Sequence, residues 1–131
     1  MLDKAFIKFS NKDWGSCAEL IANHNFEIRH GKLTPGGFTA CHMHMHKNNM
    51  VYVSSGVLFV HLYSSEDTDC RKPAHTVTLE EGGRLIIPPK VWHRLTGSEA
   101  CSEADFFEVY WQSPIDRDDV IARDAGGSNP F

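Results

Sequence analysis

Three histidines, His42, His44 and His46, occupy every second position of one short segment. On a β-strand, alternate side chains point to the same face, so the three imidazoles are expected to converge. Neutral imidazole nitrogens are suitable ligands for divalent first-row metals such as Zn, Fe, Ni or Mn. A solvated polar face that binds nothing is the alternative. The segment therefore indicates a candidate metal site.

A second segment ends in another histidine. Gly82 and Gly83 precede the apolar residues 84–87, a proline turn follows, and His93 opens the next expected strand. A β-barrel is able to place His93 opposite the first group. The alternative is a purely structural histidine at the start of a strand.

Short runs of β-branched and aromatic residues alternate with turn residues along the chain, which is typical of an all-β protein. So many short strands favour a sandwich or barrel. A helix capped by Asp13 is the alternative for residues 13–22, but Gly15 and Ser16 are poor residues for a first helical turn. The expected strands are residues 5–9, 14–22, 26–33, 38–44, 50–53, 57–63, 75–79, 84–87, 92–96, 105–111 and 120–123.

The length of 131 residues indicates one domain. We expect it to span residues 1–131, with a core at about 13–123 and a polar, glycine-rich C-terminal tail at 124–131. The net charge of −4 gives no reason to expect nucleic acid or an anionic membrane as a partner. The apolar residues 5–9 would form an exposed sheet edge, so we expect a homodimer that pairs through this strand.

The four cysteines, Cys17, Cys41, Cys70 and Cys101, contain no CxxC pair and do not predict a zinc knuckle. No apolar run reaches the ~20 residues that cross a bilayer. The N-terminus lacks the pattern of a signal peptide. We therefore expect a cytoplasmic protein whose cysteines are free thiols.

The spacing of the first histidine segment resembles the cupin superfamily. The first cupin motif, G-x5-HxH-x4-E-x6-G, matches the chain from Gly36 through His42 and His44 to Gly56, with Asn49 in place of the glutamate. The resemblance implies an all-β fold, the double-stranded β-helix or jelly-roll barrel of cupins.

The second cupin motif, G-x5-PxG-x2-H-x3-N, matches the second segment. It begins at Gly82 and includes Pro88 and His93, while Lys90 replaces the middle glycine and Gly97 the asparagine. Both motifs therefore occur in the order and at the spacing that the superfamily shows.

The resemblance implies that His42, His44 and His93 are metal ligands. Asn49 stands where a carboxylate ligand is expected, and its amide oxygen is a neutral and weaker donor. His46 is the other candidate for a fourth ligand, and a role beside the metal is its alternative. The implied cofactor is a divalent metal ion, with Zn, Fe, Mn, Ni and Co all left open.

More of the chain is similar to the cupin domain of type II mannose-6-phosphate isomerases, a domain often fused to mannose-1-phosphate guanylyltransferase. This chain has His42, Lys47 and Asn49 where that family has Gln, Arg and Glu. The resemblance implies a small carbohydrate-like ligand, such as a sugar or sugar phosphate. The similar segments are residues 13–16, 35–49, 87–94, 108–109 and 118–126.

The implied reaction is a metal-dependent isomerisation or epimerisation with His46 as the candidate base. A three-histidine ferrous site without a carboxylate resembles thiol dioxygenases, so a dioxygenase or a small-molecule lyase is a second hypothesis. A non-catalytic carbohydrate-binding or sensor protein is a third. The candidate substrate-binding residues, each with surface charge or core packing as its alternative, are Tyr52, Arg84, Lys90, Trp92 and Arg94.

Overall fold

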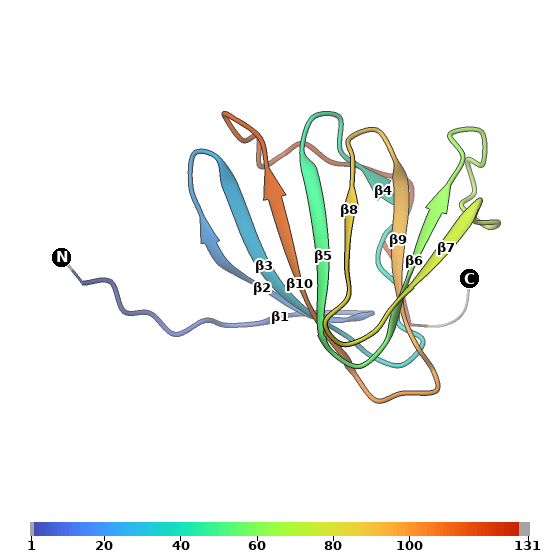
Figure 1. Cartoon of the computed structure of the whole chain (residues 1–131), viewed down its shortest axis with the longest axis horizontal. Helices are drawn as coiled ribbons and strands as arrows, with labels where there is room; N and C mark the ends of the chain where they lie inside the picture. The colour runs from blue at the N-terminus through green and yellow to red at the C-terminus, as the bar shows by residue number, and fades with distance from the viewer. Residues whose placement is uncertain (1, 129–131) are drawn as a thin grey trace.

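The computed structural model describes residues 2–128, which form strands and turns with no helix. Two antiparallel sheets have the strand orders β1-β2-β3-β10-β5-β8 and β11-β4-β9-β6-β7. Figure 1 shows the strands of the larger sheet side by side, followed by β9, β6 and β7. The strands are β1 (Ser10–Lys12), β2 (Gly15–Ala22), β3 (Phe26–Leu33), β4 (His42–Met43), β5 (Asn48–Ser55), β6 (Leu58–Tyr63), β7 (His75–Leu79), β8 (Arg84–Ile87), β9 (Trp92–Gly97), β10 (Ala104–Trp111) and β11 (Ile121–Ala122).

The core lies between the two sheets because alternate strand positions are apolar. On β5, Val51 and Val53 are buried, whereas Tyr52 between them is exposed. From the smaller sheet, Leu58 and Val60 of β6 pack into the same cluster. Each such side chain contributes on the order of 1.5–3 kcal/mol when it is fully buried. This two-residue period positions the remaining, polar inward-facing residues as well.

The expected all-β architecture agrees with the structure, and most expected strands overlap an observed one. Residues 26–33, 75–79 and 84–87 coincide with β3, β7 and β8. Residues 13–22, for which a helix was the alternative, form most of β2 after a turn.

Two expected strands differ most from the observed ones. Residues 5–9 are extended but belong to no ladder, and β1 begins only at Ser10. The segment 38–44 retains only β4 because it changes partners: Phe38 forms bridges to Thr96 and Gly127, whereas His42 pairs with His93. The bridge at Gly127 also ties the described part of the expected tail to the smaller sheet, and residues 129–131 of that tail lie outside the described residues.

A disulfide joins Cys41 to Cys70, so the expectation of four free thiols was wrong for this pair. Both side chains are fully buried, with Cα atoms 6.5 Å apart. Cysteine spacing in a sequence cannot show such a contact, because the fold brings distant segments together. Cys17 and Cys101 are free, as expected.

Replacing Cys70 by serine is expected to lower the free energy of unfolding by roughly 3.5 kcal/mol, because the bond closes a loop of 29 residues. Urea unfolding of oxidised protein measures this loss. The Cys101→Ser variant is the control and should unfold like the parent. Equal stability of the Cys70→Ser variant and the oxidised parent would contradict the prediction.

No helix among the described residues is long and apolar enough to cross a membrane. The cytoplasmic location stays a prediction. Disulfides persist mainly in oxidising compartments, so the Cys41–Cys70 bond does not support that prediction.

Candidate metal centre

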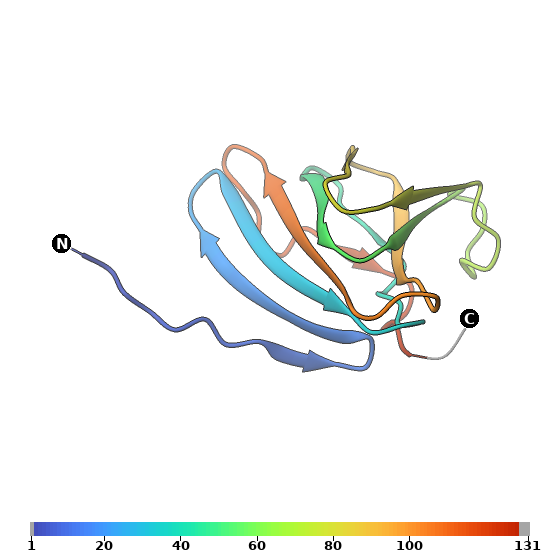
Figure 2. The ribbon, with the colours of Figure 1, turned by 60° about the horizontal axis from the view of Figure 1, so that its bottom comes forward.

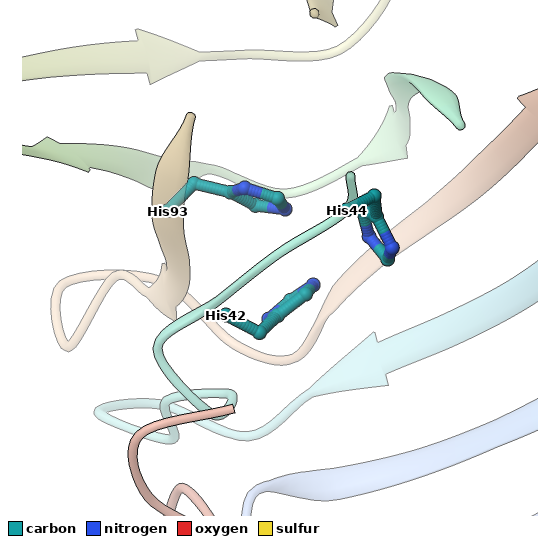
Figure 3. A group of neighbouring side chains, drawn as sticks. All are labelled: His42, His44 and His93. Atoms are coloured by element: carbon teal, nitrogen blue, oxygen red, sulfur yellow. The ribbon is translucent and has the colours of Figure 1, made fainter. Parts of the chain in front are cut away.

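Three histidines from two neighbouring strands come together at one end of the space between the sheets. His42 lies on β4, His44 follows that strand directly, and His93 lies on β9 opposite His42 in the ladder. Figure 3 shows the three rings pointing toward one another. One ligand atom from each residue lies within 4.8 Å of the others. The structure therefore brings together the three histidines that the two cupin motifs predict.

The backbone orients all three rings in the same way. The Nδ1 atom of each histidine is held by a main-chain carbonyl, which leaves Nε2 as the free donor atom. His44 and His93 each have a buried Nε2 without a hydrogen-bond partner. Buried polar atoms without partners are costly, and a metal ion is one group that would satisfy them. The carbonyl groups belong to Ala40, Asp119 and Val91, at 2.8, 2.6 and 2.9 Å from His42, His44 and His93.

Burial keeps two of these imidazoles neutral. Desolvation lowers the pKa of His44 to about 4, although the hydrogen bond to the Asp119 carbonyl acts in the opposite direction. Desolvation also holds the pKa of His93 well below its ordinary value. A neutral imidazole offers its lone pair to a metal without first losing a proton. The donor set therefore fits a divalent cation.

Asn49 is linked to this group through Tyr110 and has a buried amide oxygen without a hydrogen-bond partner. It is fully buried on β5, opposite Tyr110, whose ring packs edge-on against His44 with centroids 5.1 Å apart. The Asn49 Nδ2 donates to Glu108 at 3.1 Å, whereas its Oδ1 is buried without a partner. That oxygen is the candidate fourth donor.

His46 does not join the group. We expected three alternate histidines on one strand, but β4 ends at Met43 and the chain turns. The Asp119 carboxylate causes this turn by accepting the backbone N–H groups of Met45, His46 and Lys47 at 2.8, 2.8 and 2.9 Å. Burial acts to raise the pKa of Asp119, but these donors outweigh it and lower the pKa. The His46 side chain is left exposed.

Replacing Asp119 by alanine is expected to destabilise the fold by about 2 kcal/mol, because three backbone N–H donors, one buried and two partly buried, lose a charged acceptor. The looser turn should also weaken metal binding by about 10-fold, as loss of a supporting group does. Thermal unfolding and metal titration measure the two effects. Asp118→Ala, at the exposed neighbouring carboxylate, is the control. Unchanged stability of the Asp119→Ala variant would refute this role.

A cavity of about 320 Å³ opens beside the histidines and is lined by His42 and His44 among others. It is rich in charged groups, with a single carboxylate, Glu108. The Tyr110 hydroxyl donates to that carboxylate at 2.8 Å. Burial, followed by the charge of Glu108, raises the pKa of Tyr110 well above its ordinary value, so the phenol stays protonated. The cations in the lining are Lys12, Arg29, Lys47 and Arg117.

Glu27 anchors three of these cations from behind the cavity. Its fully buried carboxylate lies 3.2 Å from Lys47 Nζ, 3.3 Å from an Arg29 nitrogen and 3.7 Å from Arg117 Nε. Three cations around one carboxylate leave surplus positive charge at the cavity wall, although Arg117 also pairs with Glu19. The site therefore suits an anionic ligand.

Sequence reasoning missed Glu27, Arg29 and Glu108. The period of β3 and β10 could have revealed them, since Glu27 and Arg29 share the inward face with Leu33, and Glu108 shares it with Phe106. Charged residues at inward positions of a strand are costly unless they are paired, so their presence points to a network or site inside the fold. Lys47 and Arg117 lie in turns, where no such periodicity exists.

The five candidate substrate-binding residues do not line this cavity. Tyr52 and Arg84 are exposed neighbours on β5 and β8. Trp92 packs against the disulfide, under the Arg123 guanidinium at 3.6 Å from its ring centroid. Arg94 is buried, pairs with Asp124 and lines a separate cavity of about 510 Å³.

Lys90, the fifth of these residues, contributes to the site through its backbone and not through its side chain. It adopts φ +69°, a conformation that favours glycine, which is the residue of the cupin motif at this position. Its N–H donates to the His44 carbonyl at 2.7 Å, while the residue is exposed.

No family profile matches the sequence, and no curated protein matches it. Solved structures do. KdgF from a Halomonas species matches with a TM-score of 0.68 and 15% identity, over 85% of this chain and 91% of that chain. A conserved Klebsiella pneumoniae protein with a double-stranded β-helix domain matches with a TM-score of 0.69 and 16% identity, over 86% and 87%.

Oxalate decarboxylase from Bacillus subtilis matches with a TM-score of 0.71 and 16% identity, over 88% of this chain. The match spans only 30% of the decarboxylase chain. The Bacillus enzyme contains Mn(II) centres. At these identities the comparisons establish the fold alone. The chain therefore has the cupin fold, a single-domain double-stranded β-helix, and carries a three-histidine group able to hold a divalent metal ion.

Proposed function

We propose that the protein is a metal-dependent isomerase or epimerase that acts on a sugar or sugar phosphate. The observation that carries this proposal is the shared cavity, in which two metal-competent histidines, one carboxylate and four cations line the same space. The similarity of residues 118–126 to the mannose-6-phosphate isomerase family supports the same ligand class, and Asp119 of that segment shapes the turn after His44.

His42, His44 and His93 would hold the metal, with Asn49 Oδ1 as the fourth donor. When bound, the ion would polarise a substrate carbonyl and stabilise negative charge on its oxygen. The chain's own residues must then move a proton. Glu108 accepts the proton of the carbon next to the carbonyl and, in an isomerisation, returns it to the neighbouring carbon; an epimerisation would need a second proton donor on the opposite face of the substrate.

The carboxylate of Glu108 is well held for this task. Tyr110 and Asn49 both donate to its Oε2 atom, no described residue donates to the other oxygen, and the residue lines the cavity. Arg29 and Lys47, fixed by Glu27, bind the anionic end of the substrate. Glu108 thus takes the role of base that the sequence suggested for the exposed His46.

The test uses the full chain purified without a histidine tag. Bound metals are measured by mass spectrometry, and the protein is then incubated with a panel of aldose and ketose phosphates in deuterated solvent. We expect near-stoichiometric Zn, Mn, Ni or Co and deuterium exchange at the carbon next to the carbonyl. Metal-loaded protein that exchanges no deuterium into any member of the panel would overturn the proposal.

The Glu108→Gln variant separates proton transfer from metal binding. It is expected to retain the metal and lose exchange by at least ~100-fold, the usual contribution of an acid-base group. Glu103→Gln, at an exposed residue outside the cavity, is the matched control and should exchange like the parent. Full exchange by the Glu108→Gln variant would remove Glu108 from the mechanism.

One observation favours a second candidate, an Fe(II) dioxygenase. The group of possible ligands consists of three histidines and contains no carboxylate. Asn49 stands where the first cupin motif has its glutamate. Iron as the bound metal together with oxygen consumption would select this function over the isomerase.

A further inference from the structure

The outer face of the larger sheet carries an unbroken apolar row. Ile21 pairs with Ile28, which pairs with Val109, then Met50 and finally Ile86, so one row crosses β2, β3, β10, β5 and β8. These positions alternate with core residues and therefore point away from the core. An antiparallel sheet that faces water normally has polar residues there.

The neighbouring rows add aromatic side chains to this face among polar ones. Phe107 and Tyr52 pair between His30 and Arg84 in the row on one side, and Phe26 and Trp111 pair beside Asn48 in the row on the other. Ile21, Ile86 and Tyr52 are exposed, at 49%, 45% and 37%. A contiguous apolar surface of this kind marks an interaction site.

The N-terminal segment, residues 2–9, carries apolar side chains, as the outer face of the larger sheet does. Residues 2–9 run away from the body of the molecule in both ribbon views (Figures 1 and 2). Leu2 and Phe6 are 99% and 89% exposed, so the segment leaves apolar side chains in water. Phe9, at its base, already lies on the outer face, edge-on to His30 with centroids 5.1 Å apart.

The neighbouring sheet edge is also incomplete. β1 pairs with β2 only at Gly15, Ser16 and Cys17. Residues 18–22 of β2 are left without a ladder partner on that side within the described chain. An exposed edge of this kind accepts an added strand.

We propose that a second copy of this chain covers the outer face of the larger sheet, with residues 2–9 of each copy lying across the other. The apolar face and residues 2–9 belong to the same chain. In a two-fold symmetric dimer, each copy can therefore offer its face to the other copy and place its segment on the other copy's face. A compact monomer of this mass exposes roughly 7,000 Å², whereas this chain exposes 7685 Å². The excess is close to the ~800 Å² that each partner of a stable dimer buries.

Sedimentation at micromolar concentration tests the proposal with the full, metal-loaded protein. The parent is expected at twice its mass of 14.8 kDa. Val109→Lys places two like charges at the centre of the interface and should raise the dimer dissociation constant at least ~100-fold. Phe59→Lys, on the outer face of the smaller sheet, is the matched control and should remain dimeric.

Two further variants keep the test independent of any folding defect at Val109. Ile86→Lys changes an exposed residue of the same row, and deletion of residues 2–9 removes the segment alone. Each should weaken the dimer by at least ~10-fold, with circular dichroism and metal content unchanged. A monomeric parent, or a dimer that Ile86→Lys and Phe59→Lys weaken equally, would overturn the proposal while leaving the proposed activity untouched.

Discussion

Replacing His93 by alanine is expected to abolish metal retention, with a loss of affinity of at least ~100-fold. His93 is the only ligand candidate from β9 among the described histidines of the group, and its Nε2 is buried with no protein partner. Removing it leaves His42 and His44, which come from one short segment and cannot enclose an ion from the opposite side. Metal content after dialysis and a competitive chelator titration measure the effect.

The control for this variant is His46→Ala. His46 is next in the alternating series, but its side chain is exposed and lies outside the group. Its replacement should leave metal content unchanged. Retention of the metal by the His93→Ala variant, or its loss from the His46→Ala variant, would mean that the ion is held elsewhere.

Replacing Glu27 by leucine is expected to cost about 3–5 kcal/mol of unfolding free energy, because it leaves the buried Lys47 ammonium without its counter-charge. Lys47 is only 3% exposed, and its other contacts are the Arg117 carbonyl at 3.4 Å and the Tyr110 ring at 4.8 Å from its centroid. Neither replaces a carboxylate. Urea unfolding at neutral pH measures the loss.

The double variant Glu27→Leu/Lys47→Met decides whether the ion pair is the cause. Apolar residues of similar volume often replace a buried pair at little cost, so the double variant should be more stable than Glu27→Leu alone. Glu19→Leu is the control: this carboxylate is 40% exposed in its pair with Arg117, and its loss should cost less than ~1 kcal/mol. A double variant less stable than the single one would exclude this explanation.

The sequence allowed the fold and the three-histidine group to be predicted because both depend on local patterns. Alternation of apolar residues defines the strands, and the two cupin motifs place His42 and His93 on paired strands. Motif spacing transfers to structure here because each histidine lies at a fixed offset from a turn, such as the left-handed position of Lys90.

The features that could not be predicted from the sequence depend on contacts between distant segments. His46 leaves the expected face because of Asp119, which lies 73 residues further along the chain. Cys41 meets Cys70, and Lys47 meets Glu27, only after the sheets have formed. The spacing of residues within a motif does not identify partners so distant in the sequence. The residues of the cavity wall are therefore evident only in the folded structure.

β4 is held in place by cross-links as well as by its ladder. It has two residues and pairs with β9 only at His42. The disulfide fastens the residue before it to the loop after β6, and a bound ion would fasten His42 and His44 to His93. Each link closes a long loop and therefore removes freedom from the unfolded chain. Metal binding and formation of the disulfide should therefore each restrict the motion of β4. Hydrogen exchange of the β4 backbone amides would report whether the metal is bound and whether the disulfide is formed.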